Sequence, residues 1–344
     1  MAADLQSAPV LTSLLREVSR SFYLTLWVLP GAVRESIGLA YLLARATDTI
    51  ADTALVPLAD RTLALSALRE RILGERRTPL DFRALAEAQE GKSSAAERVL
   101  LLRIEEAISL LERQGEFDRT CIREVLVTIT GGQLLDLERF GGVEAGIVRG
   151  LGTDAELDDY TYRVAGCVGE FWTKLTRKHV FPSDPLDEAR FLEAGIRFGK
   201  GLQLVNILRD LPGDLRSGRC YIPWESLEPL GLAPADLLST TAEPALRPLY
   251  LSLVDRAQGH LEAGWDYTRM IPLRFRRLRL ACAWPLLIGA RTLGMLRTGP
   301  VLAQGAKIKV PRSEVRQILW QSVVRLPLQR RWNRLFQEWR TREL

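Results

Sequence analysis

The sequence predicts an all-α fold in one domain spanning residues 1–344. Apolar residues recur at spacings of three and four through most of the chain, as on the buried face of an α-helix. Ala, Leu, Glu and Arg, which favour helices, fill these segments. We find no segment in which apolar and polar residues alternate between turn residues, so no sheet is predicted. Several segments are apolar around most of their circumference, so we expect a helical bundle around a central apolar cavity.

Proline and glycine breaks divide the chain into the expected helices. A polar stretch at 76–94 predicts a surface connection, and a basic amphipathic tail is expected at about 316–344. The helical segments predicted by apolar periodicity are 11–28, 38–54, 58–73, 95–111, 118–139, 158–180, 187–211, 245–270, 273–296 and 312–339.

Composition limits the chemistry that the chain can perform. The net charge of +5 suits anionic substrates, anionic lipid surfaces or nucleic acid, and does not choose among them. Only two histidines occur, His179 and His260, which argues against zinc sites and Ser-His-Asp mechanisms. Catalysis is therefore expected from carboxylates, Arg or Lys, Tyr or a bound metal.

The four cysteines lack the spacing of a metal site, so we expect buried, reduced thiols. The first residues lack the basic and apolar pattern of a secretory signal. No apolar stretch of about 18 residues predicts a membrane-spanning helix. These features together favour a cytoplasmic location.

Two D-x-x-x-D motifs carry the strongest chemical signal: Asp48 with Asp52, and Asp210 with Asp214. On a helix, residues four apart lie on one face, where two carboxylates repel each other. Mg²⁺ would compensate, because it binds carboxylate oxygens while bridging substrate phosphates. One such pair alone is usually a solvated helix face. Two pairs in apolar, buried surroundings favour a metal site.

Arginines accompany both motifs: Arg45 lies three residues before Asp48, and Arg209 and Arg219 flank the second pair. A guanidinium group matches the geometry of diphosphate oxygens. Two such helices at the mouth of an apolar cavity would suit the ionisation of an allylic diphosphate. Pro212 lies inside the second motif, and we expect the helix to end or kink near Asp210.

These motifs resemble those of the squalene/phytoene synthase family, over about residues 19–315. The similarity includes Arg-Ala-Thr-Asp-Thr-Ile-Ala-Asp at 45–52 and Tyr-x-x-x-Val-Ala-Gly-x-Val-Gly at 160–169. It also includes Ser-Arg-Ser-Phe at 19–22, the second acidic motif at 203–214 and Gly-Arg-Cys-Tyr-Ile-Pro at 218–223.

The resemblance implies an isoprenoid-synthase fold and the head-to-head condensation of two prenyl diphosphates with two or three Mg²⁺ ions. It places Tyr160 near the first proton transfer. It implies metal ligation by Asp48, Asp52, Asn206, Asp210 and Asp214. The residues that it places around the diphosphate groups are Arg20, Ser21, Phe22, Tyr41, Arg45, Gln203, Asn206, Arg209 and Arg219.

Within the family, the amino-acid sequence of the first motif is most like that of the squalene synthases. That branch joins two farnesyl diphosphates through presqualene diphosphate and then reduces the product with NADPH. Lys307, Lys309 and Arg312 resemble its NADPH loop, and they form a compact cationic segment suited to a nucleotide phosphate. An ordinary basic surface loop would have the same composition.

Several alternatives remain open. A dehydrosqualene or phytoene synthase would share the site without the reductive step, and a presqualene diphosphate synthase would stop earlier. A terpene cyclase fits two Arg-supported motifs less well, and a non-catalytic membrane-peripheral scaffold would release no diphosphate. No motif supports nucleic-acid binding. The C-terminal tail suits either contact with an anionic bilayer or packing on the bundle.

Overall fold

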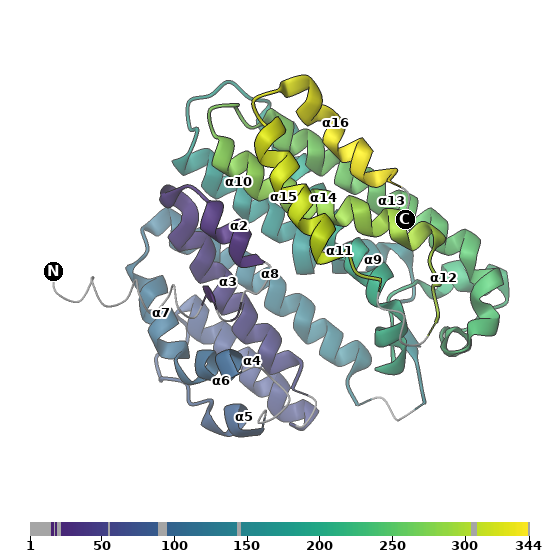
Figure 1. The fold of residues 1–344 in the computed structure, drawn as a ribbon. Coiled ribbons are helices and arrows are strands. Elements are labelled where there is room, and N and C mark those ends of the chain that lie inside the picture. Colours follow the sequence, from purple (N-terminus) through teal and green to yellow (C-terminus); the bar gives the residue numbers. More distant parts are fainter. Residues whose placement is uncertain are drawn as a thin grey trace. The chain divides into compact units, whose positions relative to one another are not determined.

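The computed structural model confirms the all-α class (Figure 1). It describes residues 15–16, 18, 22–53, 56–88, 95–142, 146–303 and 308–342. The chain packs as two compact units. Unit 1 comprises the chain up to Gly141 together with Lys174–Pro182, and unit 2 comprises Gly142–Thr173 and Ser183–Leu344.

Unit 1 is built around helix α3 (Gly31–Ala51), which carries the first acidic motif. The α3 core residues Leu39, Leu42 and Leu43 are fully buried. Helix α3 packs against α2, α4, α6, α7 and α8. The bounds of the other helices of unit 1 are α2 (Phe22–Val28), α4 (Leu58–Leu73), α5 (Arg83–Ala88), α6 (Ala95–Leu102), α7 (Ile104–Arg113) and α8 (Glu116–Phe140).

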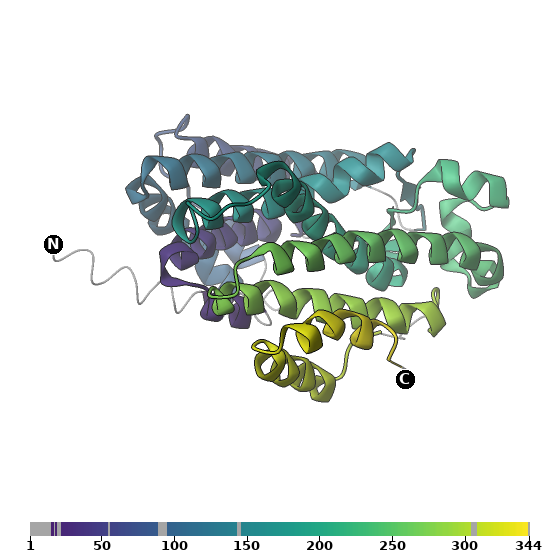
Figure 2. The same cartoon turned by 90° about the horizontal axis from the view of Figure 1, so that it is seen from above.

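Unit 2 is built around α11 (Glu188–Arg216), which carries the second acidic motif and packs along α13 (Glu243–Met270). Helix α14 (Arg276–Thr298) packs on α13, and Figure 2 shows these two green helices side by side. The other elements are β1 (Arg149–Gly150), α9 (Asp154–Thr161), the π-helical segment η1 (Tyr162–Gly166), β2 (Arg219–Cys220), α12 (Trp224–Leu227), three 3₁₀ turns (Glu228–Leu230, Pro234–Leu238 and Thr240–Ala242), α15 (Arg312–Arg325) and α16 (Gln329–Arg340). Helix α10 (Cys167–His179) begins in unit 2, and its residues from Lys174 onward belong to unit 1.

Of the two outcomes expected near Asp210, an end or a kink of the helix, the end is wrong, because α11 continues through Pro212 to Arg216. Proline has no N–H, so the carbonyl of Leu208 loses its helical partner. The hydroxyl of Tyr250, a fully buried residue of α13, donates a hydrogen bond to this carbonyl at 3.0 Å. A side chain from the neighbouring helix thus donates the hydrogen bond that this carbonyl would receive from a backbone N–H if residue 212 were not proline.

Replacement of Tyr250 with phenylalanine should lower the free energy of unfolding by about 1–3 kcal/mol, since it leaves a buried carbonyl without a partner. Urea denaturation followed by circular dichroism would measure the loss. Adding Pro212→Ala should recover part of it, because the alanine N–H can then reach Leu208. Equal stability of Tyr250→Phe and the wild type would contradict this account.

The structure also differs from the predicted helix boundaries. The stretch 76–94, expected as a connection, contains the short helix α5. The expected helix at 312–339 is two helices, because α15 ends at Arg325 and α16 begins at Gln329, on either side of Pro327. The pairing of β1 with β2 was not predicted, since two residues are too few to show an alternating pattern.

Other expectations are confirmed. All four cysteines are buried free thiols. Among the described residues, no helix is long and apolar enough to cross a membrane. The apolar side of α16 packs into unit 2, where Trp332, Leu335, Phe336 and Trp339 are buried. Trp332 stacks on Trp265 with ring centroids 5.4 Å apart.

Candidate active site

The first acidic pair lies at the C-terminal end of α3. Asp48 belongs to the last turn, and Asp52 caps the helix with its backbone N–H 2.9 Å from the Asp48 carbonyl oxygen. Both side chains reach solvent, since Asp52 is exposed and the Asp48 side chain is 46% exposed. The expectation that these carboxylates are buried is therefore wrong for Asp52, whereas Asp48 is half-buried beside the apolar residues that precede it.

Asp48 has a defined environment despite its exposure. The Gln133 side chain on α8 donates its Nε2–H to Asp48 Oδ1 at 2.5 Å, and Arg45 Nη1 lies 4.0 Å from Oδ2. The surrounding protein and the charge of Asp52 raise the pKa of Asp48 to about 6. The two neighbouring carboxylates repel each other when both are charged. A divalent cation bound between them would relieve this repulsion, because Mg²⁺ and Ca²⁺ take oxygen atoms as ligands.

Arg45 is held from the other side by Glu97 on α6, with which it forms an ion pair. The Glu97 side chain is only 7% exposed, whereas that of Arg45 is 31% exposed. A buried carboxylate needs such a partner, since removing its hydration without compensation is costly. The guanidinium group therefore occupies a fixed position beside Asp48 and remains partly accessible to an anion.

The second motif forms a line along one face of α11. Gln203, Asn206, Asp210 and Asp214 follow one another at spacings of three, four and four residues, which stacks them on the same side of the helix. The side chains of Gln203 and Asn206 make no hydrogen bond to another group within the described part of the chain. Their amide groups are therefore available to a ligand.

Arg209 pairs with Asp210, and its Nε donates to Asp210 Oδ1 at 2.9 Å. Asp210 is exposed and Asp214 is half-buried. A neighbouring guanidinium and carboxylate can bind a diphosphate and a metal ion at the same time, each through its own charge. Arg219 follows in β2, whose pairing with β1 begins opposite Arg149.

Tyr160 lies at the end of α9, is 9% exposed and stacks on Tyr221 with centroids 4.5 Å apart. The two residues meet because β1 precedes α9, β2 precedes Tyr221, and the two strands pair in parallel. Tyr221 was not predicted as a site residue, although it stands in the Gly-Arg-Cys-Tyr-Ile-Pro segment. The stacking fixes the orientation of the Tyr160 ring.

The glycines of the Val-Ala-Gly-x-Val-Gly segment pack against α11, as their small size predicts. A Cβ atom added at Gly169 would collide with the backbone of Gly195, and one added at Gly199 would collide with the backbone of Ala165. The backbones approach too closely for any side chain. This crossing of η1 and α10 over α11 connects the segment that carries Tyr160 to the helix that carries the second motif.

A charged cluster lies beside this crossing. Asp158 accepts ion pairs from Lys200 at 2.5 Å and from Arg256 at 3.3 Å. His260 lies nearby, and burial together with the charges of Arg197 and Lys200 lowers its pKa to about 4. His260 is therefore neutral in the folded protein at neutral pH.

Replacement of His260 with glutamine should make folding stability less sensitive to acid. The pKa of His260 in the folded protein, about 4, lies below the ordinary value of 6.5. As the pH falls, the unfolded chain therefore binds a proton at this histidine before the folded chain does, which favours unfolding. The wild type should lose stability as the pH falls from 6.5 to 4, and the variant should lose less, by a few degrees in melting temperature. Measuring the melting temperatures of the wild type and the variant from pH 7.5 to 4 tests this prediction. Melting temperatures that fall equally with pH in both proteins would contradict it.

Several predicted site residues lie outside the described part of the chain: Arg20, Ser21 and Lys307, together with the side chain of Phe22. Tyr41 on α3 is half-buried, and its hydroxyl donates to the Val18 carbonyl oxygen at 3.4 Å. Lys309 and Arg312 are exposed.

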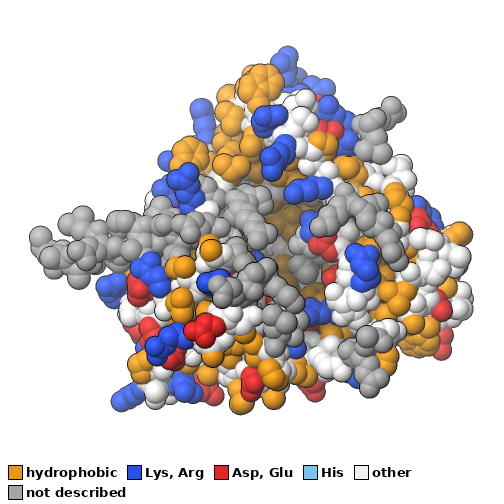
Figure 3. Space-filling view, turned by 60° about the horizontal axis from the view of Figure 1, so that its bottom comes forward, with side chains coloured by type: hydrophobic (Ala, Val, Ile, Leu, Met, Phe, Trp, Pro, Cys, Tyr) orange, Lys and Arg blue, Asp and Glu red, His pale blue; other side chains and the backbone are white. Residues whose placement is uncertain are grey.

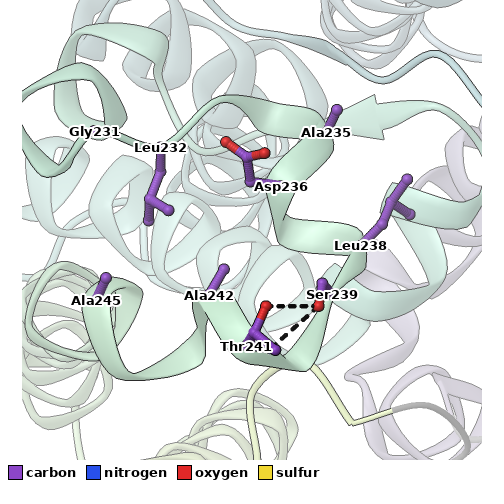
Figure 4. A pocket seen from close by; sticks show the side chains of 9 residues that line it. All are labelled: Gly231, Leu232, Ala235, Asp236, Leu238, Ser239, Thr241, Ala242 and Ala245. Carbon is purple, nitrogen blue, oxygen red and sulfur yellow. Dashed lines mark hydrogen bonds between the residues drawn. The ribbon is translucent and has the colours of Figure 1, made fainter.

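The described carboxylates do not form a closed metal site, and a surface pocket in the described part of the chain contains none of the predicted site residues. Among the described residues, no group of three or more His, Cys, Asp and Glu side chains could hold a metal ion by itself. Each motif offers two carboxylates, which suits Mg²⁺ because this ion completes its coordination with water and substrate phosphates. An open surface pocket next to α13 (Figure 4) is lined by residues such as Asp236 and Ser239 and includes no predicted site residue.

On the face drawn in Figure 3, Lys and Arg side chains occur among hydrophobic, acidic and other side chains, and no continuous basic stripe of described residues crosses that face. A nucleic-acid interface would instead require cations gathered along one surface.

The chain is similar to known proteins over most of its length. Residues 15–314 match the family model described as squalene/phytoene synthase. Presqualene diphosphate synthase from Zymomonas mobilis is 31% identical over 308 residues, covering 88% of this chain and 87% of that protein.

Solved structures show the same fold. A structure of TcSQS with the ligand E5700 has a TM-score of 0.75 at 21% identity, covering 97% of both chains. A dehydrosqualene synthase has a TM-score of 0.65 at 23% identity, covering 94% of this chain and 98% of its own. The chain therefore belongs to the squalene/phytoene synthase family, whose members are prenyl-transferring enzymes.

Proposed function

We propose that the protein is a presqualene diphosphate synthase that joins two farnesyl diphosphates head to head. The observation that carries this proposal is the similarity to the Zymomonas enzyme, which extends over 88% of the chain. The two acidic motifs supply the carboxylate, amide and guanidinium groups that a metal–diphosphate complex requires. The central apolar cavity expected from the sequence is part of the proposal.

The reaction would begin with cleavage of the C1–O bond of one farnesyl diphosphate, whose diphosphate leaves with the electron pair. The C2=C3 double bond of the second molecule then attacks C1, and loss of a proton closes a cyclopropane ring. The products are presqualene diphosphate and inorganic diphosphate. Tyr160 would assist the proton transfer, because the stacked Tyr221 ring holds it in one orientation.

The residues on α3 and α11 would hold the leaving group. Asp48 and Asp52 would bind metal from the first motif, and Asn206, Asp210 and Asp214 would bind it from the second. Bound Mg²⁺ would neutralise the charge that develops on the leaving diphosphate. The side chains that would contact diphosphate oxygens directly are Arg20, Ser21, Tyr41, Arg45, Gln203, Arg209 and Arg219. Phe22, whose ring has no polar group, would line the pocket beside them.

A squalene synthase, the first choice from the sequence, is the second candidate. Lys309 and Arg312 favour it, since two exposed cations in one short segment can bind the phosphates of NADPH. That enzyme would ionise presqualene diphosphate again and reduce the rearranged cation with a hydride from NADPH.

Incubation with farnesyl diphosphate and Mg²⁺, with NADPH present or omitted, separates the candidates. Mass analysis should show presqualene diphosphate in both reactions. Squalene formed only with NADPH would favour the second candidate, and dehydrosqualene or a product made from geranylgeranyl diphosphate would identify a carotenoid-type enzyme. Absence of Mg²⁺-dependent diphosphate release from either substrate would overturn the enzymatic proposal.

We also propose that the protein contacts the cytoplasmic face of the membrane through α15. Trp320 is 66% exposed, Val323 is 51% exposed, and Arg312 and Arg316 precede Trp320 at spacings of four on the same helix face. The Glu314 carboxylate on this helix is paired with Arg291 at 2.6 Å. An apolar strip bordered by arginines suits an anionic bilayer.

Replacing Trp320 and Val323 together with serine should reduce sedimentation with vesicles that contain phosphatidylglycerol several-fold. Vesicles of phosphatidylcholine alone should bind the wild type weakly, because they lack the anionic charge. Wild-type protein that stays in the supernatant with both kinds of vesicle would contradict the membrane contact without affecting the assignment of the reaction.

A further inference from the structure

We infer that Gln133 and Glu97 are positioning residues that hold the first acidic motif in the arrangement that binds a metal–diphosphate complex. The inference rests on the proposed function, because it concerns the same site. Neither residue belongs to a motif, and each reaches α3 from another helix of unit 1: Gln133 from α8 and Glu97 from α6.

Gln133 fixes one oxygen of Asp48. Its Nε2 donates to Oδ1 at 2.5 Å, and the opposite orientation of the amide would place two oxygens against each other. Asp48 Oδ2 makes no hydrogen bond with the described residues, and its nearest cation, Arg45, lies at 4.0 Å. One oxygen is thus held by the protein, and the other remains available to a metal ion.

Glu97 fixes the arginine of the motif. Its carboxylate is buried and forms an ion pair with Arg45, whose side chain is partly exposed. An arginine held at one edge keeps its remaining N–H groups in a defined direction, which reduces the entropy lost when an anion binds. The two contacts together determine where the carboxylate and guanidinium of the first motif meet a ligand.

A purely structural role for these residues makes a different prediction. Hydrogen bonds and ion pairs of the same kind occur elsewhere in unit 1, away from the acidic motif. Gln114 donates to Glu35 at 3.1 Å, and Arg71 pairs with Glu105 at 2.9 Å. If Gln133 and Glu97 only stabilise the fold, variants at these control positions should affect ligand binding equally.

The first test compares Gln133→Leu with Gln114→Leu. Calorimetric titration of each purified full-length protein with Mn²⁺ and inorganic pyrophosphate measures binding without catalysis. Gln133→Leu should bind Mn²⁺ about 10- to 100-fold more weakly than the wild type, as is typical when a partner of a metal ligand is removed. Gln114→Leu should match the wild type.

The second test concerns Glu97. At saturating Mn²⁺, Glu97→Gln should bind pyrophosphate at least about 10-fold more weakly, because Arg45 is no longer held. Glu105→Gln is the matched control and should bind normally. If the amide that Glu97→Gln introduces at this buried position impairs folding, the double variant Arg45→Gln/Glu97→Gln removes both charges. It should bind no more weakly than Arg45→Gln alone, because the two residues act as one unit.

The outcomes separate this inference from the proposed function. Wild-type affinity in both Gln133→Leu and Glu97→Gln would overturn the positioning role while leaving the enzyme assignment intact. Equal losses in the matched controls would also overturn it in favour of a structural role. A wild-type protein that binds no Mn²⁺–pyrophosphate would instead overturn the function on which the inference rests.

Discussion

Replacement of Asp48 with asparagine should lower the Mg²⁺-dependent rate of diphosphate release from farnesyl diphosphate by about 100-fold or more. The amide keeps the shape of the side chain and removes the negative charge that would bind the metal, an interaction worth several kcal/mol in the transition state. A coupled assay for inorganic diphosphate measures the rate. Asp60→Asn is a matched control, since Asp60 is an exposed carboxylate on α4 outside the motif.

The same substitution should not destabilise the fold. The pKa of Asp48 is raised to about 6 by the surrounding protein and by Asp52, so the charged form is disfavoured in the folded state above that pH. A neutral asparagine avoids this cost, and the variant should melt at the same temperature as the wild type or higher at pH 7.5. Full activity in Asp48→Asn would refute the site assignment, and a lower melting temperature would contradict the electrostatic account.

Replacement of Gly169 with alanine should destabilise the protein by about 3 kcal/mol or more, because the new methyl group meets the Gly195 backbone, which cannot rotate away. The helices α10 and α11 would have to separate along their crossing. Urea denaturation measures the loss, and activity should fall as the position of Tyr160 relative to α11 is disturbed.

Gly259→Ala provides the control for this substitution. Gly259 lies within α13, and a Cβ atom built there has no neighbour within 4 Å. Alanine is the better helix former, so this variant should be unchanged or more stable by up to about 1 kcal/mol. If Gly169→Ala unfolds at the same urea concentration as Gly259→Ala, the close crossing is not required for stability.

The positions of the candidate ligands could be read from local spacing. Asp48 and Asp52 are four residues apart, and Gln203, Asn206 and Asp210 follow at three and four, so a helix places each set on one face whatever surrounds it. The small glycines of the 160–169 segment likewise permit a close helix crossing, and Gly169 lies against the Gly195 backbone. The metal and diphosphate roles of these residues stay predictions for the experiments above.

The environment of the site could not be read in this way. Gln133 lies 85 residues after Asp48, and Glu97 lies 52 residues after Arg45, so no periodic pattern connects them. Each pairing depends on which helices pack against α3. The solvent exposure of Asp52 is also a property of the packed unit, and the apolar residues around it in the chain suggested burial instead.

The sequence by itself determined the all-α class, the family and the residues that share a helix face, because these depend on composition, motifs and the 3.6-residue period of the helix. Only the tertiary structure decided that α11 continues through Pro212, since the hydrogen bond that replaces the missing one comes from Tyr250 on another helix. It likewise decided that α16 buries its tryptophans while α15 exposes Trp320. Such outcomes depend on contacts between distant segments, which local propensity does not encode.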